Sequence, residues 1–193
     1  MKKLLNSAAL LVAVLVLLQP ARAQQASDDD EPSGASALVR HVGSLDEVRQ
    51  LLATPGTRNQ AMLVQQGNAN RLTVDQQALT GSASNLVQLE QIGDYNLLNV
   101  QQQGSGLEQR VVQQGNGNEV ASRMRGSEVE SVISQSGNAN RVQQDLNVNQ
   151  RTYVIEQTGG RNELIQRENG QSTPVGYEVR MTGNMRVVIE HGP

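Results

Sequence analysis

A six-residue pattern, Q-x-G-x-x-N, recurs along most of this chain and sharply limits what the chain can fold into. The first two copies start 26 residues apart, and each later copy starts 22 residues after the one before it. An evenly spaced repeat of this length is typical of a stacked array, in which each unit packs only on its neighbours. The five copies begin at Gln65, Gln91, Gln113, Gln135 and Gln157, and Met181-x-Gly183 marks a decayed sixth copy.

Each copy lies between two short runs in which apolar and polar residues alternate. In the second copy, the alternation of residues 85–91 repeats at residues 96–102, eleven residues later, with Gly93-Asp94 between the two runs. A period of two over seven residues is typical of a strand with one buried face, and a Gly-Asp step indicates a reversal. Each unit is therefore predicted to be strand, tight turn, strand. The predicted units are 59–76, 85–102, 107–124, 129–146 and 151–168, with a degenerate sixth at 175–192.

These units predict an all-β fold, a cross-β solenoid with repeats of about 22 residues that is able to form amyloid. Branched aliphatic side chains at the inner positions would pack between two facing sheets, as in a steric zipper. Gln and Asn at the ends of the inner rows would hydrogen-bond to their equivalents in the next rung, about 4.8 Å away, because a side-chain amide both donates and accepts. The predicted amide ladder comprises Gln65, Asn70, Gln76, Asn85, Gln91, Asn96, Gln102, Gln113, Asn118, Gln135, Asn140, Gln157 and Asn162.

The second glutamine of the unit is retained only in the first two copies, as Gln76 and Gln102. Met124, Leu146 and Glu168 hold the same position in units three to five. We expect the second ladder to be weaker in those three units, because these side chains cannot replace the amide as both donor and acceptor.

The turn between the two strands is predicted to need glycine, which adopts positive φ without steric cost. The asparagine that follows the glycine, as in Asn68 and Asn138, is expected to adopt the left-handed region. The predicted turn glycines are Gly67, Gly93, Gly115, Gly137, Gly159 and Gly183.

Residues 1–23 have the three regions of a secretory signal peptide. Two lysines form a positive n-region, residues 4–18 are mostly apolar, and Ala21-Arg22-Ala23 matches the small-x-small cleavage pattern. We predict export with cleavage between Ala23 and Gln24; the apolar run is short for a membrane anchor. Cleavage removes three basic residues and leaves 13 basic against 19 acidic side chains, a net charge of 13 − 19 = −6. This balance gives no support to nucleic-acid binding.

Residues 24–58 differ in composition from the repeats and are predicted to form an acidic leader. The acidic run at 28–31 is typical of a disordered arm, and its consecutive carboxylates lack the alternating spacing of a calcium loop. Downstream, apolar residues recur at helical spacing and Ser44 with Glu47 resembles a capping box, which predicts a short helix near 45–53. This helix would cap the repeats, bind an export partner, or form only transiently.

Composition and motifs favour a structural protein over an enzyme. Three tyrosines are the only aromatic residues, and cysteine is absent. His41 and His191 are too few and too far apart to suggest a catalytic or metal site. The glycine-containing turns lack the lysine of a phosphate-binding loop. No catalytic residue, cofactor or metal is therefore predicted.

The repeated Q-x-G-x-x-N, with its alternating strand and a second Gln six residues after the Asn, resembles the curlin repeat of bacterial curli fibres. The resemblance covers residues 59–190. It implies secretion through a dedicated outer-membrane pore, assembly into cross-β fibres at the bacterial cell surface, and a role in adhesion and biofilm formation. The implied partners are further copies of the chain, the other curlin subunit, the export machinery, and extracellular matrix or host surfaces.

Within this family, the chain is more similar to the minor curlin, the nucleator that templates fibres, than to the major fibre subunit. Residues 89–97 and the opening Asn59-Gln60-Ala61 look like nucleator repeats. The last unit also looks like the nucleator's divergent last repeat, because basic and apolar residues replace the Gln and Asn ladder there. These residues are Arg180, Met181, Arg186, Val187 and Val188.

Three classes of function remain in competition at this point. The favoured class is an amyloid fibre protein, either nucleator or major subunit, because open rung edges invite addition of further strands. A monomeric β-solenoid adhesin or ligand-binding module is the second class, although its outward positions would normally carry a regular row of Thr or aromatics. An enzyme on a β-helix scaffold is the third, and clustered acids are lacking for it.

Overall fold

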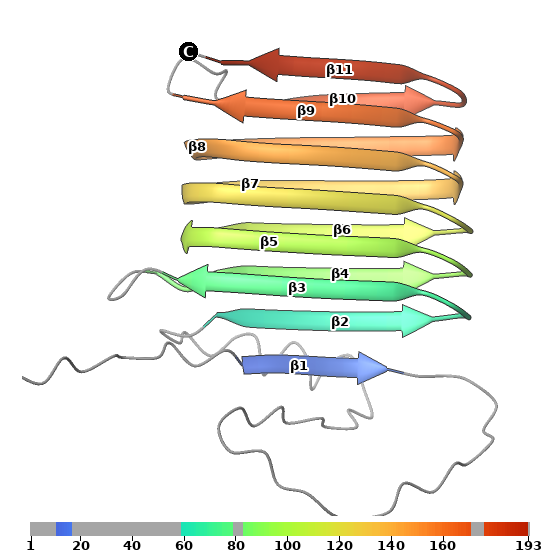
Figure 1. Ribbon diagram of the computed structural model, residues 1–193, viewed down its shortest axis with the longest axis horizontal. Helices are drawn as coiled ribbons and strands as arrows, with labels where there is room; N and C mark the ends of the chain where they lie inside the picture. The colour runs from blue at the N-terminus through green and yellow to red at the C-terminus, as the bar shows by residue number, and fades with distance from the viewer. Residues whose placement is uncertain (1–10, 17–58, 79–82, 171–175, 193) are drawn as a thin grey trace, which may run out of the picture.

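The described residues form one parallel β-solenoid with no helix (Figure 1). The computed structural model describes residues 11–16, 59–78, 83–170 and 176–192. The all-β solenoid predicted from the repeat is confirmed. The strands are β1 (Leu11–Val16), β2 (Gln60–Gln66), β3 (Arg71–Ala78), β4 (Leu86–Ile92), β5 (Leu97–Ser105), β6 (Glu108–Gln114), β7 (Glu119–Asn138), β8 (Arg141–Gly160), β9 (Glu163–Asn169), β10 (Gly176–Thr182) and β11 (Arg186–His191).

Each predicted unit forms one rung of the stack. The two strands of a rung do not pair with each other; each pairs in parallel with the equivalent strand of the next rung. Rung 1 is β2 with β3, rung 2 is β4 with β5, and rung 6 is β10 with β11. The long strands β7 and β8 each serve two rungs. Rung 3 is β6 with the first half of β7, rung 4 is the second half of β7 with the first half of β8, and rung 5 is the second half of β8 with β9.

The register between rungs keeps every sequence position in one column. Leu63 pairs with Leu89, which pairs with Val111, and the same alignment continues through β7 and β8. β7 and β8 bend at Glu128 and Gln150, which have φ values of 55° and 55° and lead each strand into the next rung. A residue of one rung therefore lies beside its equivalent in the next, as ladders require.

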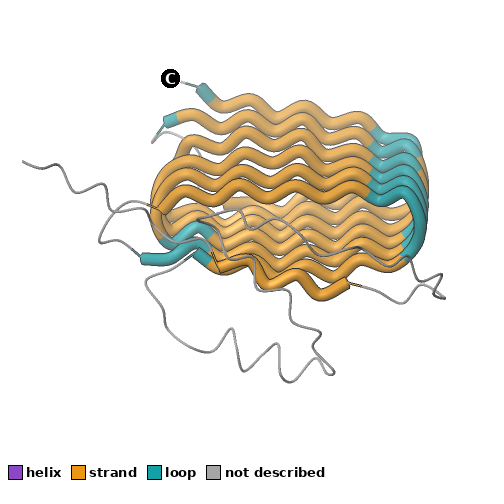
Figure 2. Tube along the Cα trace, turned by 60° about the horizontal axis from the view of Figure 1, so that its bottom comes forward, coloured by secondary structure: helices purple, strands orange, loops and turns teal. Residues whose placement is uncertain are grey.

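Figure 2 shows two facing layers of strands, joined along one side by a column of stacked turns. The space between the layers is filled by aliphatic side chains. The continuous core runs through all six rungs and comprises Ala61, Leu63, Val87, Leu89, Leu98, Val100, Val111, Val120, Ile133, Val142, Ile155, Leu164 and Met181, with Leu72, Val74, Val179, Val187 and Ile189 packed against it. The inward positions predicted from the alternation are confirmed.

A second apolar cluster occupies the opposite corner from the turns, from rung 3 onward. Its buried members are Leu107, Met124, Val129, Leu146, Val148 and Tyr153, with Tyr177 packed against them. Rungs 1 and 2 carry Asn59, Gln76, Asn85 and Gln102 at this corner instead. The polar corner thus changes to an apolar one partway along the stack.

All six predicted turn glycines have positive φ, from 61° at Gly183 to 117° at Gly137. The expectation for the next residue is wrong. Neither Asn68 nor Asn138 has positive φ; the residue after it does, as in Ala69 at 53° and Ala139 at 56°. The asparagine keeps an ordinary φ because its backbone and side chain take part in hydrogen bonds along the column of turns.

Several predictions fall on residues outside the described ranges. They include the leader at 24–58 with its helix and the cleavage position at Ala23 and Gln24. β1 lies within the predicted signal peptide, for which the sequence predicted no place in the fold, and pairs in parallel with β2 from Leu11 opposite Gln60 to Val16 opposite Gln65. Within the described ranges there is no helix long and apolar enough to cross a membrane.

Candidate functional site

The most regular feature of the interior is a column of buried glutamines beside the turns. Nε2 of each glutamine donates to Oε1 of its equivalent in the next rung: Gln91 to Gln113 at 2.8 Å, Gln113 to Gln135 at 2.9 Å, and Gln135 to Gln157 at 2.8 Å. The second amide hydrogen reaches a backbone carbonyl, as from Gln113 to Leu97 at 3.3 Å. The predicted Gln ladder is therefore present through four consecutive rungs, and it ties each rung to the next.

The first glutamine of the column lies outside this chain of bonds. Gln65 is in register with Gln91 but half-buried, and Gln91 Oε1 has no hydrogen-bond partner among the described residues. Gln65 borders the stack on the β2 side, where solvent competes for its amide. The ladder thus begins one rung later than the sequence predicts.

The asparagine column runs parallel to the glutamines but bonds differently. Oδ1 of each Asn accepts the backbone N–H of the next Asn, as from Asn118 to Asn96 Oδ1 at 3.0 Å, and Nδ2 donates to a turn-glycine carbonyl, as from Asn96 to Gly115 at 2.8 Å. Direct bonds between side chains join only the last three members, with Asn140 Nδ2 donating to Asn118 Oδ1 at 3.2 Å and Asn162 Nδ2 to Asn140 Oδ1 at 2.9 Å. The asparagine column therefore holds the turn backbone in place, because its side chains bond to backbone N–H and C=O groups. A ladder of side-chain bonds alone would leave those backbone groups unbonded.

A third column of hydrogen bonds lies at the tip of the turn and was not predicted from the sequence. The backbone N–H of Asn68 donates to Asp94 Oδ1 at 2.7 Å, that of Asp94 to Asn116 Oδ1 at 2.8 Å, and that of Asn116 to Asn138 Oδ1 at 2.9 Å. The signal was available, because Asn or Asp follows the glycine in each of the first four copies. Turn preference alone accounts for an Asn or Asp at this position, so the residue type does not by itself indicate these hydrogen bonds.

The second glutamine ladder is confined to rungs 1 and 2, as predicted. Gln76 Nε2 donates to Gln102 Oε1 at 2.8 Å, and Asn59 Nδ2 donates to the Gln76 carbonyl at 3.0 Å. Asn85 continues this corner by accepting the backbone N–H of Leu107 at 3.0 Å. Beyond this point the apolar second cluster takes over, so the stack is held at that corner by packing.

A polar row that the sequence did not predict crosses the interior from rung 3 to rung 6. Ser122 donates to Gln144 Oε1 at 2.8 Å, and Gln144 donates to Gln166 Oε1 at 2.9 Å. Gln166 Nε2 then donates to the Tyr177 hydroxyl at 2.8 Å, and Tyr177 donates to the carboxylate of Glu168. Valines hold the equivalent position in the first two rungs, so the sequence has no repeated polar residue there that would indicate this row.

The polar row ends at a buried carboxylate near the C-terminus. The Glu168 side chain is fully buried, and its Oε2 lies 2.9 Å from His191 Nδ1. Tyr177 contacts both Tyr153, with ring centroids 5.1 Å apart, and His191, at 6.4 Å. Glu168 occupies the position of the second glutamine, so the hydroxyl and imidazole of rung 6 here replace the amide ladder.

Comparison of the chain with protein-family models, curated proteins and solved structures finds no match.

Both ends of the stack have unpaired strand edges among the described strands, at β3 on one side, where β2 pairs with β1, and at β10 and β11 on the other; the two ends differ. Among the described strands, β3 pairs only with β5, and β10 and β11 pair only with β8 and β9. On the β2–β3 side, Gln76 Oε1 is buried and has no hydrogen-bond donor within the described part of the chain. On the other side, Gln157 donates to the sulfur of Met181 at 3.4 Å, so the Gln column cannot continue. Met185 takes the Asn position; the sequence-based assignment of Arg186 to the ladder is wrong, because Arg186 lies one residue further on, opposite Glu163.

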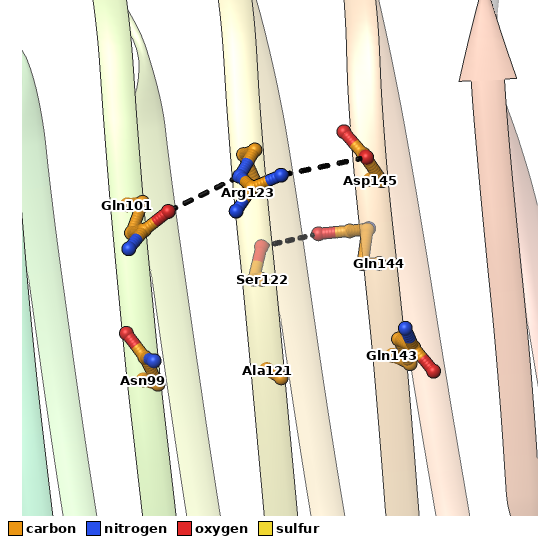
Figure 3. Close-up of a pocket in the computed structure, with 8 residues that line it drawn as sticks. All are labelled: Asn99, Gln101, Ala121, Ser122, Arg123, Gln143, Gln144 and Asp145. Atoms are coloured by element: carbon orange, nitrogen blue, oxygen red, sulfur yellow. Dashed lines mark hydrogen bonds and ion pairs between the residues drawn. The ribbon is translucent and has the colours of Figure 1, made fainter.

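The described residues present no candidate metal site. They contain no group of three or more His, Asp or Glu side chains placed to hold a metal. A shallow hollow lies over Ala121, between Asn99 and Gln143, and is bordered by Arg123 and Asp145 (Figure 3). Its other polar groups are side-chain amides and the Ser122 hydroxyl, which donates to Gln144 Oε1 at 2.8 Å.

The Tyr177 cluster makes the last rung sensitive to alkali. Burial, followed by the hydrogen bond to Glu168, raises the pKa of Tyr177 above the ordinary tyrosine value of 10.0. The pKa of Tyr177 is therefore higher in the folded chain than in the unfolded chain, so the protonated phenol stabilises the fold. This stabilisation is fully present below pH 10 and is lost progressively as the pH rises towards the pKa of Tyr177 in the folded chain. Protection of β10 and β11 from proteolysis is expected to fall steadily above that pH.

The Tyr177→Phe variant tests this pH dependence, because phenylalanine cannot ionise. Its C-terminal rung is expected to be weaker at neutral pH, since Glu168 and Gln166 lose a partner. Its protease protection should nevertheless lose the extra decline above pH 10 that the wild-type chain shows. Parallel alkaline declines in the two proteins would contradict the assignment to Tyr177.

Proposed function

We propose that this chain is a structural subunit of extracellular, curli-type amyloid fibres at the bacterial cell surface, of the minor, nucleator-like kind. One observation carries this proposal: parallel, in-register rungs linked by a buried Gln ladder that ends in unpaired strand edges. A strand of another subunit added to such an edge finds its backbone groups and its side-chain amides already aligned.

The rung geometry supports templating in particular. A template must present a pre-formed edge, since nucleation of a β-stack is slow when distant segments have to be brought together first. Each rung here lies in the register of its neighbours, and Gln91, Gln113 and Gln135 are fully buried. A partner with the same repeat would extend the columns without rearranging them. The proposed partners are the major curlin subunit, further copies of this chain, the export and outer-membrane secretion machinery, and matrix or host surfaces.

The nucleator role is tested by adding substoichiometric secreted chain to the cognate major subunit and timing the lag before dye-detected fibres form. The lag is expected to shorten severalfold. Unchanged lag together with abundant fibres from this chain alone would point to the major-subunit role. A chain that stays monomeric and dye-negative at high concentration, and leaves the lag unchanged, would contradict the proposal in both forms.

A matched pair of variants separates templating from unspecific effects in the same assay. Gln91→Ala removes the donor to Gln113 and should lengthen the lag. Glu90→Ala changes an outward side chain one residue away and should leave the lag unchanged, because it takes no part in a column. Equal effects of the two substitutions would contradict the role given to the amide columns.

A further inference from the structure

Charged side chains on the outer face of one sheet alternate in sign from rung to rung. The first charged row contains Arg71, Leu97, Glu119, Arg141, Glu163 and Arg186, aligned through β3, β5, β7, β8, β9 and β11. Adjacent members form ion pairs, Arg141 with Glu119 at 3.4 Å and Arg186 with Glu163 at 2.8 Å. From rung 3 onward, each charge thus lies beside an opposite charge.

A second charged row lies four residues further along the same strands. It contains Asp75, Gln101, Arg123, Asp145, Arg167 and Glu190. Arg123 lies between Gln101, whose Oε1 accepts its Nε–H at 3.1 Å, and Asp145, whose carboxylate is 4.0 Å away (Figure 3). Arg167 pairs with Glu190 in the last rung. This row also alternates, with signs opposite to those of the first row.

The alternation fails where one copy of the chain would join another. If a second copy continued the stack in the same register, its first rung would follow rung 6 of the copy before it. Arg186 would then lie opposite Arg71, and Glu190 opposite Asp75. Like charges directly opposite each other in a sheet are destabilising. Met181 and Met185 would also lie opposite Gln65 and Asn70, so neither column would continue across this junction.

We propose that the edge formed by β2 and β3 is built to receive a rung from a different subunit, one with an acid opposite Arg71 and a base opposite Asp75. This inference rests on the proposed function and names the partner surface for it. The same acid–base spacing occurs within the chain, at Glu119 with Arg123 and at Glu163 with Arg167, and each pair lies next to a rung with reversed signs. The matching rung also carries a glutamine that donates to the unpaired Gln76 Oε1.

Cleavage of the predicted signal peptide would remove β1 from this edge. β1 occupies the edge of β2 in the full-length chain, in parallel and in register, but it lies within the predicted signal peptide. Arg71 and Asp75 are exposed, and neither forms an ion pair with another described residue that a substitution would disrupt. The β2–β3 edge therefore already accepts a parallel strand, and its charges can be reversed without loss of an internal salt bridge.

The experiment compares self-assembly of the secreted chain, from Gln24 onward, with that of its R71E/D75R variant. Reversal changes both like-charge contacts at the junction between copies into attractive ones. In low salt the variant is expected to assemble alone with a lag about three- to tenfold shorter than that of the unchanged chain. In about 0.5 M salt the difference should largely vanish, because the screening length is then only a few ångströms and the charges at the junction interact weakly. R71K/D75E, which retains both charges, is the control.

A synthetic peptide of residues 107–124 with the substitution M124Q, which carries Glu119, Arg123 and a glutamine at the position opposite Gln76, tests the partner chemistry directly. In low salt it should bind the secreted chain several times more tightly than the same peptide with E119R/R123E. The order should reverse with the R71E/D75R chain. Equal lags of the two chains in low salt, or peptide affinities that ignore these charges, would overturn the inference while leaving fibre formation intact. Absence of fibres from every chain in every salt would overturn the proposed function as well.

Discussion

Replacing Gly115 with alanine is expected to destabilise the stack by about 3 kcal/mol or more. A Cβ at this position would lie 2.0 Å from the carbonyl oxygen of Gly137 in the next rung, and Gly115 has a φ of 114°. Neither the backbone of the neighbouring rung nor the turn itself can move without breaking the column of turns. The contact recurs at Gly67 and Gly93, which explains why the sequence repeats glycine at this position.

Gly117, two residues further along the same turn, provides the matched control. It also has positive φ, 63°, but a Cβ there would meet nothing within 4 Å. The equivalent residues Ala69 and Ala139 already adopt this conformation. Gly117→Ala is therefore expected to change the free energy of unfolding by about 1 kcal/mol at most.

Chemical denaturation of freshly prepared monomer, followed by circular dichroism, measures both substitutions. Because a solenoid can unfold in segments, protease release of rungs 3 and 4 should be followed in parallel. Gly115→Ala should expose these rungs well before the wild-type chain does. A Gly115→Ala chain as stable as the Gly117→Ala chain would contradict the close approach of successive turns.

The second large effect is expected at the Gln column, where Gln113→Leu should cost about 2–4 kcal/mol. Gln113 accepts from Gln91 and donates to Gln135 and to the Leu97 carbonyl. Leucine fills a similar volume but leaves Gln91 Nε2 and Gln135 Oε1 buried without partners. Each unpaired buried group costs roughly 1–3 kcal/mol.

Gln109 is the control in the same strand, β6. It is fully buried, and neither atom of its side-chain amide has a hydrogen-bond partner within the described residues. Gln109→Leu should be neutral or stabilising, because it removes an unsatisfied amide. Thermal melting of the two variants should shift in opposite directions, or at least differ clearly. A loss of stability from Gln109→Leu as large as that from Gln113→Leu would show that the column contributes no more than bulk packing does.

The sequence predicted those parts of the structure in which every rung uses the same residue for the same purpose. Gly93 and Gln91 are examples, since each recurs at a fixed spacing and has one physical role. The order of rungs, the inward positions and the turn glycines followed from that regularity. The position of the left-handed residue did not, because Ala69, Tyr95 and Arg161 adopt it without any shared preference.

Features that change from rung to rung could not be read from the repeat. The row from Ser122 to Tyr177 replaces valines of the first two rungs, and in the sequence it looks like loss of pattern. Glu168 likewise looks like a degenerate glutamine until rung 6 places Tyr177 and His191 beside it. The outward charges change from rung to rung without a repeated motif, so the repeat alone does not indicate which of them form ion pairs.

If the proposed function is right, the chain enters fibres as a pre-formed stack of six rungs, added end to end. The chain contains no cysteine, so Glu90→Cys places a single nitroxide label on an outward position. In fibres grown in high salt, labels of successive chains should lie about 29 Å apart, six rungs of about 4.8 Å, and show no spin-exchange narrowing. A single exchange-narrowed line, as from labels stacked about 4.8 Å apart, would show flat in-register stacking and contradict the account.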